Sequence, residues 1–253
     1  MITIDFKHLD LKRGDRILDI GCGEGRHTAK AWESPGVLCV GADRCHGDLL
    51  ISKKKLKLHQ ELSEQTTGAT NKEAVDNSIW TLLCADITRL PFGNHSFDAV
   101  ICSEVMEHIH NEDKAISELK RVLKPAGRLA LSVPRYWPEK ICWKLSHEYS
   151  NSQGGHIRIY TKKGLLKKII PSGFEFQGSH HAHSLHAPFW WLKCLTGLGH
   201  NNSDSKLVSL YHKLLVWDLM EKPFITQFIE KLLNPVMGKS LVLYFRSDSS
   251  INL

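Results

Sequence analysis

The chain has 253 residues, of which 42% are hydrophobic, 24% charged and 8% aromatic. These fractions are those of an ordinary globular protein, and they exclude disordered and fibrous classes. The net charge of +6 is small for this length and forms no basic face of the kind a dedicated nucleic-acid-binding protein carries, so we expect no nucleic-acid partner.

No apolar run is long enough to cross a bilayer, and the first residues lack the apolar region of a secretory signal. The seven cysteines are odd in number, and no two have C-x-x-C spacing. Reduced thiols in a soluble, cytoplasmic protein are the natural interpretation. Peripheral contact with a membrane surface stays open, as does the choice between monomer and homodimer.

Short apolar runs alternate with helical patterns over the first two-thirds of the chain. Strands are predicted at 16–20, 37–43, 80–86, 97–102 and 128–134, with helices at 25–32, 48–62 and 113–123. Near-continuous apolar strands separated by amphipathic helices indicate an α/β fold, in which helices cover both faces of a parallel sheet. The polar stretch 63–77 is predicted to be a mobile surface insertion.

The later part of the chain differs in composition, because Trp, His, Phe and Leu become frequent from residue 136 onward. Helices are predicted at 161–170, 207–220 and 225–233, with strands at 174–177 and 240–245. We therefore expect one domain over 1–253, with a core at 9–134, a substrate-side loop at 135–160 and a helical insertion at about 182–238, before the last strand.

A glycine loop follows the first predicted strand. Gly21, Gly23 and Gly25 allow a sharp turn and a close approach of backbone to a ligand. Their G-x-G-x-G spacing differs from the G-x-G-x-x-G of dinucleotide sites. Asp19 precedes the loop, and an acid there suits a ligand that has a cationic amino group and no pyrophosphate. S-adenosylmethionine is such a ligand.

Two more acids end the next two strands. Ligands of open parallel sheets bind beyond the carboxyl ends of the strands. Asp43 is placed there to accept hydrogen bonds from a ribose diol, and Asp86 to accept from an adenine amino group, with Ile87 packed against the ring. The alternative is that the glycines only form a tight turn and the acids only cap helices.

Four stretches of the sequence resemble class I S-adenosylmethionine-dependent methyltransferases, in the broad type 11 subgroup that includes quinone-biosynthesis enzymes. They are Ile17–Arg26, Ala85–Phe92, Ser96–Ile109 and Leu119–Leu129. The resemblance covers residues 9 to about 134, and more loosely 155–173.

The resemblance implies a Rossmann-like fold with a seven-stranded, mostly parallel sheet, and S-adenosylmethionine as cofactor. It is specific for the cofactor and uninformative about the methyl acceptor. The implied cofactor-binding residues are Asp19, Gly21, Cys22, Gly23, Gly25, Asp43, Arg44, Asp86, Ile87 and Ser103.

Glu104, Glu107 and His108 follow the fourth strand and would share one face if the segment were helical. Three interpretations compete. Glu107 and His108 can orient the turn beneath the cofactor; His108 can be the catalytic general base, since histidine titrates near neutral pH; or all three residues can hold a divalent metal with a further ligand from downstream. Our predicted site takes His108 as catalytic and contains no metal.

The second histidine-rich candidate is 180–186, where His181 and His183 would share one strand face. A role in the substrate pocket or in loop ordering is favoured there over a dedicated metal site. His156, Arg158 and Tyr160 are candidates for substrate contact.

Aromatic residues mark the insertion, with Trp190 and Trp191 inside the run 188–195, and Trp137, Trp143 and Tyr149 in the expected loop. They either fill the gap between insertion and sheet or form a lid over an apolar substrate. We therefore expect a methyltransferase acting on a small, lipophilic or aromatic acceptor. The alternative acceptors are RNA and protein.

Overall fold

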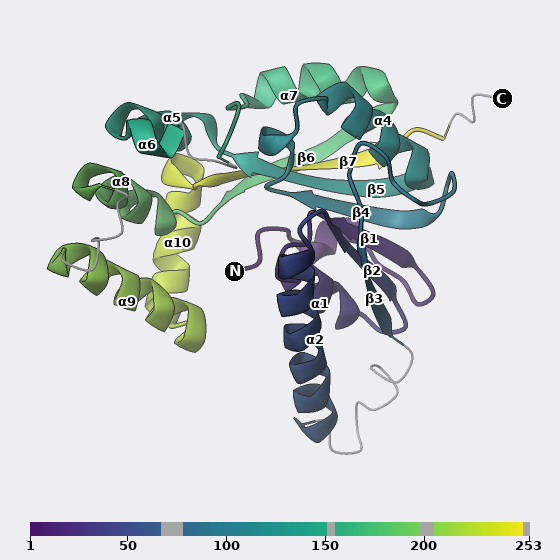
Figure 1. Ribbon diagram of the computed structural model, residues 1–253, viewed down its shortest axis with the longest axis horizontal. Helices are drawn as coiled ribbons and strands as arrows, with labels where there is room; N and C mark the ends of the chain where they lie inside the picture. Colours follow the sequence, from purple (N-terminus) through teal and green to yellow (C-terminus); the bar gives the residue numbers. More distant parts are fainter. Residues whose placement is uncertain (67–77, 151–154, 198–204, 250–253) are drawn as a thin grey trace.

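The computed structural model describes residues 1–66, 78–150, 155–197 and 205–249, in which strands and helices alternate along most of the chain (Figure 1). The strands are β1 (Arg16–Ile20), β2 (Leu38–Asp43), β3 (Ile79–Cys84), β4 (Phe97–Ser103), β5 (Leu123–Pro134), β6 (Phe174–Ala182) and β7 (Ser240–Ser247). The α-helices are α1 (Arg26–Trp32), α2 (His46–Thr66), α4 (Glu112–Val122), α5 (Tyr136–Leu145), α6 (His147–Ser150), α7 (Lys162–Ile169), α8 (His186–Thr196), α9 (Lys206–Glu221) and α10 (Phe224–Met237). Short 3₁₀ helices are η1 (Phe6–Leu9), η2 (Met106–His108) and η3 (Ile170–Ser172).

The seven strands form one sheet in the order β3-β2-β1-β4-β5-β7-β6. Neighbours from β3 to β5 run parallel, whereas β7 is antiparallel to both β5 and β6. The predicted mostly parallel, seven-stranded sheet is thus confirmed. The strand order reverses between β1 and β4, which is where open sheets of this kind bind ligands.

Successive residues of the central strands pack on opposite faces of the sheet. Leu18 and Val100 belong to the larger core cluster, beneath α4 and α7. Ile17 and Ile101 belong to the smaller one, which includes residues of η1 and α1. Because both faces are covered, these strands are apolar on both sides, and this accounts for the continuous apolar runs in the sequence.

The fifth strand begins earlier than the sequence pattern predicts. β5 starts at Leu123, directly after α4, and Pro125-Ala126-Gly127 lies within it. Ala126 has a φ of 61°, and a Cβ on Gly127 would lie 3.1 Å from the carbonyl oxygen of Asp98. The three residues therefore form an irregularity in a strand, opposite a register shift in β4, instead of a loop before it.

The expected substrate-side loop is largely helical, because α5 and α6 occupy most of 136–150. The insertion before the last strand is confirmed as α8, α9 and α10, which lie with α5 and α6 to the left of the sheet (Figure 1). Among the described residues, no helix has the length and apolarity needed to cross a membrane. The insertion predicted at 63–77 lies outside the described residues from 67 onward.

Candidate functional site

The glycine loop between β1 and α1 is fixed by packing as well as by backbone conformation. Gly21, Gly23 and Gly25 have φ angles of 70°, 51° and 82°. A Cβ on Gly21 would lie 2.2 Å from a methyl carbon of Val105, and one on Gly25 would lie 2.2 Å from the hydroxyl of Ser52. A Cβ on Gly23 would meet no atom within 4 Å, so the middle glycine borders open space.

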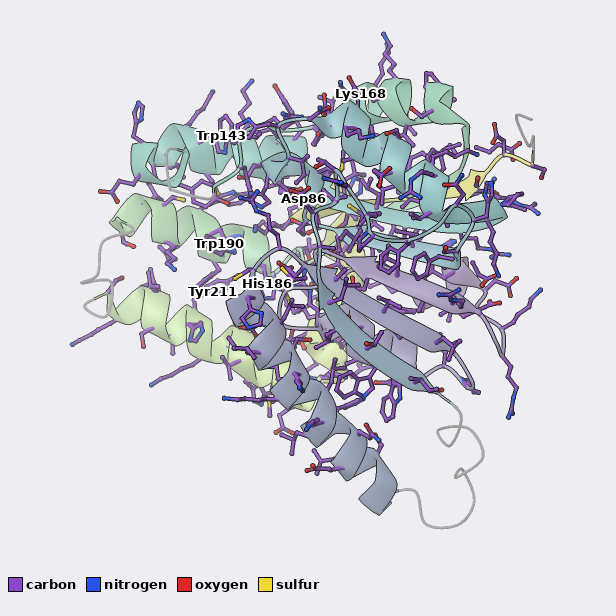
Figure 2. All side chains as sticks on the ribbon, turned by 45° about the vertical axis from the view of Figure 1, so that its right-hand side comes forward. Asp86, Trp143, Lys168, His186, Trp190 and Tyr211 are labelled. Carbon is purple, nitrogen blue, oxygen red and sulfur yellow. The ribbon has the colours of Figure 1, made fainter. Side chains whose placement is uncertain are left out.

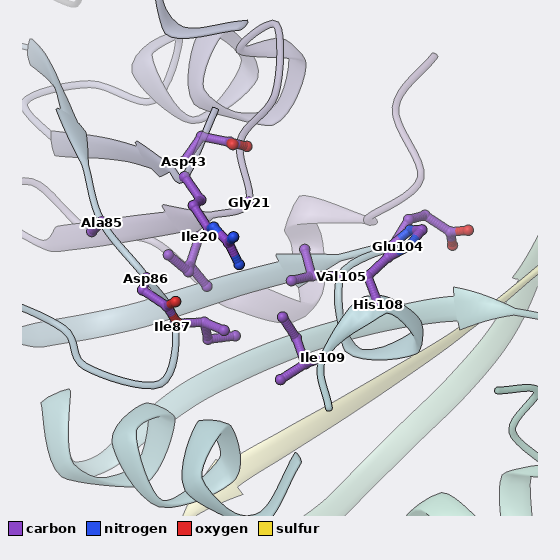
Figure 3. Close-up of a pocket in the computed structure, with 11 residues that line it drawn as sticks. Ile20, Gly21, Asp43, Ala85, Asp86, Ile87, Glu104, Val105, His108 and Ile109 are labelled. Carbon is purple, nitrogen blue, oxygen red and sulfur yellow. The ribbon is translucent and has the colours of Figure 1, made fainter. Parts of the chain in front are cut away.

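Two clefts open beside this loop and share Gly21 and Glu104 in their walls. The first has a volume of about 190 Å³ (Figure 3) and is lined by Ile20, Gly21, Asp43, Arg44, Ala85, Asp86, Ile87, Glu104, Val105, His108 and Ile109. The second is lined by Met1, Gly21, Cys22, Gly23, Glu24, Gly25, Arg26, His27, Ala29, Lys55, His59, Ser103, Glu104 and Leu219. Every residue of the predicted site except Asp19 lines one of them.

Local hydrogen bonds hold the two strand-end acids in place. The carboxylate of Asp43 accepts from the backbone amides of Gly23, at 2.8 Å, and Cys45, at 2.7 Å. That of Asp86 accepts from the amide and hydroxyl of Thr88, at 2.8 and 2.7 Å. The backbone and side-chain hydrogen bonds from Thr88 lower the pKa of Asp86, so this acid stays ionised and remains a hydrogen-bond acceptor at neutral pH.

Asp19 lies behind the loop and is only 1% exposed. Its Oδ2 accepts a hydrogen bond of 2.7 Å from the Thr28 hydroxyl, and its Oδ1 has no hydrogen-bond partner among the described residues. Burial raises the pKa of Asp19 to about 6, against opposing effects of Thr28 and Arg26. A buried carboxylate with an unused oxygen favours a cationic neighbour.

The segment after β4 does not form the helical face considered for Glu104, Glu107 and His108. Only a 3₁₀ turn, η2, is present, and Glu104 lies outside it with a φ of 57°. The Glu104 carboxylate accepts from the Ser132 hydroxyl at 3.0 Å. Glu104 thereby lies at the junction of the two clefts, outside the 3₁₀ turn that contains Glu107 and His108.

His108 lies where the first cleft meets a wider outer one, whose wall includes Gly155 and Ile157. Its Nδ1 is 3.1 Å from the carbonyl oxygen of Gly155. A carbonyl oxygen can only accept, so Nδ1 carries the proton of the neutral ring, and the lone pair is on Nε2. The ring can therefore accept a proton at Nε2.

Glu107 and His156 are the residues brought together with His108. Glu107 is fully buried, and neither carboxylate oxygen has a hydrogen-bond partner among the described residues. Burial, with the nearby charge of Glu104, raises the pKa of Glu107 well above its usual value. Donor atoms of Glu107, His108 and His156 all lie within 4.8 Å of one another. His156 therefore takes the position in this group that the sequence pattern suggested for Glu104.

Glu139 on α5 completes this cluster, and the sequence analysis did not identify it. Its carboxylate accepts hydrogen bonds from His156 (2.6 Å), Trp143 (3.2 Å) and Tyr149 (3.3 Å). Burial alone would raise the pKa of Glu139, but the hydrogen bond and charge of His156 outweigh it and lower the pKa. The only sequence signal that could have identified Glu139 is the presence of an acidic residue within the aromatic and apolar segment that follows β5.

The remaining candidates of the later chain lie elsewhere. Arg158 and Tyr160, considered for substrate contact, both bind Glu112 at the start of α4, at 2.7 and 2.5 Å. Neither lines the clefts described above. His181 and His183 do not share a strand face, because β6 ends at Ala182 and His183 has a φ of 66°.

A row of rings connects the insertion to His108. The ring of His108 lies 5.0 Å from that of His156, which is 6.1 Å from Tyr149, and Tyr149 is 5.8 Å from Trp190 on α8. Trp143 and Trp190 lie on neighbouring helices in Figure 2. Trp191 binds the backbone oxygen of Pro138 through its ring nitrogen, so α5 and α8 are joined.

Comparisons with known proteins identify related sequences and related folds. Residues 18–131 match the family model described as a methyltransferase domain. The chain is 33% identical over 123 residues to a 27-O-demethylrifamycin SV methyltransferase of Amycolatopsis mediterranei, covering 49% of this chain and 40% of that protein. It is 31% identical over 126 residues to a demethylmenaquinone methyltransferase of Corynebacterium urealyticum, covering 50% and 44%. The chain thus spans about two-fifths of the length of such relatives.

Among solved structures, phosphoethanolamine N-methyltransferase 2 of Haemonchus contortus, in complex with S-adenosylmethionine, superposes with a TM-score of 0.58 and 19% identity. The match covers 97% of this chain and 51% of that one, and shows a shared fold. Residues 18–131 are thus similar to a methyltransferase domain, and the fold over nearly the whole chain is that of class I S-adenosylmethionine-dependent methyltransferases.

Proposed function

We propose that this protein transfers a methyl group from S-adenosylmethionine to a small, lipophilic or aromatic acceptor. The observation that carries the proposal is the position of His108, between the cleft beside the glycine loop and the outer cleft. In this proposal, residues 9–134 bind the cofactor, while 135–160 and 182–238 bind the acceptor. The protein acts as one domain in the cytoplasm.

The cofactor assignment follows the chemistry of the cleft walls. Asp43 and Arg44 would border the ribose, Asp86 and Ile87 the adenine, and the glycine loop with Cys22 and Ser103 the methionine part. The buried carboxylate of Asp19 balances the cofactor's ammonium group through the loop. These residues fit S-adenosylmethionine, because the carboxylates of Asp43 and Asp86 can accept hydrogen bonds from its ribose hydroxyls and its adenine amino group.

When bound, the cofactor supplies a methyl group already activated on a sulfonium sulfur. The protein's task is then to align the acceptor and to remove its proton. The cofactor would donate this methyl group to the acceptor's lone pair and would keep the electrons of the broken sulfur–carbon bond on sulfur. His108 takes the acceptor's proton at Nε2, and the Gly155 carbonyl stabilises the charged ring.

The acceptor class is supported by the row of rings from His156 through Tyr149 to Trp190, which begins next to His108 and continues into the insertion. Relatives named for rifamycin and menaquinone substrates support a small-molecule acceptor over RNA or protein.

Cofactor binding tests the first half of the proposal. We expect calorimetry to detect binding of S-adenosylhomocysteine, and Asp43→Asn to weaken it by tenfold or more, because a hydrogen bond to a charged group contributes about 1.5–3 kcal/mol. Asp10→Asn, a distant surface acid, is the control. No binding by the wild-type protein would contradict the proposal.

Acceptor choice tests the second half. Methyl transfer from labelled cofactor to a panel of phenols, quinols and lipid-linked alcohols should be detected, and His108→Ala should lower kcat while leaving cofactor affinity unchanged. Labelling of RNA or protein alone would show that the acceptor class is wrong.

A second candidate is methyl transfer assisted by a divalent metal. Glu107, His108 and His156 offer a buried carboxylate without hydrogen-bond partners and two imidazoles, a donor set that fits such an ion, and Glu139 would orient His156. Their chemistry would then be to hold the ion that positions an acceptor oxygen. Full activity of metal-free protein would rule this candidate out.

A further inference from the structure

A second group of histidines and acid lies outside the proposed active site, where the insertion meets the N-terminal segment. His183 follows β6, His186 begins α8 and Glu230 lies on α10. His186 is at the inner end of α8, with Trp190 one turn further out (Figure 2). His183 is 8% exposed, and the side chain of Glu230 is 18% exposed. The group is therefore largely shielded from solvent.

The donor atoms of this group converge. One ring nitrogen of each histidine and one carboxylate oxygen of Glu230 all lie within 4.8 Å of one another. Nδ1 of His183 is 3.9 Å from Oε1 of Glu230, and the two imidazole rings are 5.9 Å apart. His183 and His186 are three residues apart, whereas Glu230 comes from α10, so two segments that are distant in sequence bring these donor atoms together.

Two of these atoms are buried without a hydrogen-bond partner among the described residues, Nδ1 of His186 and Oε1 of Glu230. A buried polar atom left without a partner costs about 1–3 kcal/mol. Both residues belong to the group whose donor atoms converge, and a cation would accept a lone pair from each.

The contacts around His183 fit a metal ligand. Its Nε2 is 3.1 Å from the Thr3 hydroxyl, and the Thr3 amide donates to Nε2 of His27 at 3.1 Å. A histidine that binds metal through one nitrogen commonly holds its ring in place through the other. Here the Thr3 contact leaves Nδ1 directed at Glu230. The φ of 66° at His183 turns the side chain out of the strand to this position.

We propose that His183, His186 and Glu230 bind one divalent metal ion with the coordination chemistry of Zn²⁺, with water as the fourth ligand. Two imidazoles and one carboxylate are a donor set that zinc accepts. Zinc bonds of about 2.0–2.1 Å in a tetrahedron place ligand atoms about 3.3 Å apart. The 3.9 Å separation requires only a small closure, by side-chain rotation.

The ion would join three parts of the chain beside the cofactor. Met1 and His27, near Thr3, and Leu219 on α9 line the cleft that also contains the glycine loop. A metal that holds the start of α8 and the middle of α10 against residue 3 would fix the insertion at this cleft. The site is separate from His108, and its role does not depend on which acceptor is methylated.

The test is metal binding by the whole protein. Metal-free protein, prepared by chelation and without a histidine tag, is titrated with Zn²⁺ against a chromophoric chelator and with Co²⁺ by absorption. We expect one equivalent bound with tetrahedral Co²⁺ bands. Glu230→Gln keeps the shape of the side chain but removes the charge, and should weaken Zn²⁺ binding more than about 100-fold, beyond the effect of losing an outer contact. His186→Ala should do the same.

Two control variants separate this site from others. His181→Ala removes a neighbouring histidine that is not one of the three proposed ligands. His108→Ala disrupts the separate cluster at the proposed active site. Both variants should still bind one equivalent of Zn²⁺. Chelation should lower the melting temperature of the wild type but not of Glu230→Gln, whose fold is checked by circular dichroism. Zn²⁺ binding that persists in Glu230→Gln, depends on His108, or is absent from the wild type would overturn the proposal.

Discussion

At the scale of single residues, a glycine can be required by its backbone conformation or by the packing around it, and Gly21 of the glycine loop meets both requirements. Gly21 and Gly14 both have positive φ, of 70° and 89°, but only a Cβ on Gly21 meets a neighbour, Val105. The loop conformation therefore depends on residue 105 as well as on residue 21. Because Val105 also lines the first cleft, the same contact sets the shape of the proposed cofactor site.

Substitution of these two glycines by alanine should lower the free energy of unfolding by different amounts. We expect Gly14→Ala to lower the free energy of unfolding by about 1 kcal/mol, for the backbone alone. Gly21→Ala adds an overlap with Val105 and should cost about 2–4 kcal/mol. Denaturant unfolding measures both. Val105→Ala should recover part of the loss in Gly21→Ala but none in Gly14→Ala, and equal costs for the two glycines would show that the contact is unimportant.

Asp19 should oppose stability while it supports cofactor binding. Its pKa in the folded protein, about 6, is above the ordinary value of 3.8, so the folded state holds the proton more tightly than the unfolded state. The free energy of unfolding therefore falls as the pH rises from about 4 to 6 and Asp19 ionises, and it stays at the lower value at pH 7. Asp19→Asn should then raise the unfolding free energy at pH 7 by on the order of 2 kcal/mol, with no gain below pH 4.

The same variant should bind S-adenosylhomocysteine more weakly at pH 7. In the wild type, affinity should fall below pH 6 as Asp19 is protonated, and in Asp19→Asn this dependence should flatten. His59→Gln, which changes another residue of the same cleft wall, is the control variant. An unchanged pH profile in Asp19→Asn would contradict the role given to this carboxylate.

At the scale of helices, α9 and α10 expose an unusual amount of apolar surface. The apolar face of α9 and α10 comprises Leu207, Leu210, Leu214, Trp217, Met220, Phe224, Ile225, Phe228, Leu232 and Val236, each at least 42% exposed. Four exposed lysines accompany it, at 206, 213, 222 and 231, with one exposed acid, Glu221. Apolar side chains flanked by lysines suit the surface of an anionic bilayer. We propose that this face rests on such a surface, from which a lipophilic acceptor is delivered.

Vesicle flotation tests this contact. Phe228→Asp should reduce binding to vesicles containing phosphatidylglycerol by tenfold or more, because a buried Phe contributes about 1.5–3 kcal/mol. Ser209→Asp, on an exposed position of α9, adds the same charge without removing apolar surface and is the control. Equal loss in both would indicate attraction by charge alone. A wild-type homodimer that Phe228→Asp dissociates would show that a second copy covers the face.

At the scale of the whole molecule, the sequence predicts the fold well and the site in part. The sheet and the glycine loop depend on local patterns, which are visible within a few residues of each strand end. The grouping of His108 with His156 depends on contacts between segments almost 50 residues apart, such as the pairing of Ile157 with the backbone of Glu107. The spacing of apolar residues in the sequence does not predict such a long-range contact.

Two departures from expectation have the same local cause. Glu104 and His183 both have positive φ, which few residues other than glycine adopt, and neither position carries a glycine or asparagine that would signal a turn. The turn at Glu104 ends any helical face, and the turn at His183 directs its ring toward Glu230. In both places the surrounding tertiary contacts set the backbone conformation.

The strand order also has a consequence for how the protein is made. β7 is the last of these seven strands in sequence, yet it lies inside the sheet, between β5 and β6. Until Ser240–Ser247 has emerged, β6 has no strand to pair with. The helices α8, α9 and α10, which connect β6 to β7, are then attached to the sheet at neither end. A nascent chain can therefore assemble the glycine loop and its neighbouring strands early, but β6, β7 and the helices between them stay unassembled until Ser240–Ser247 has emerged.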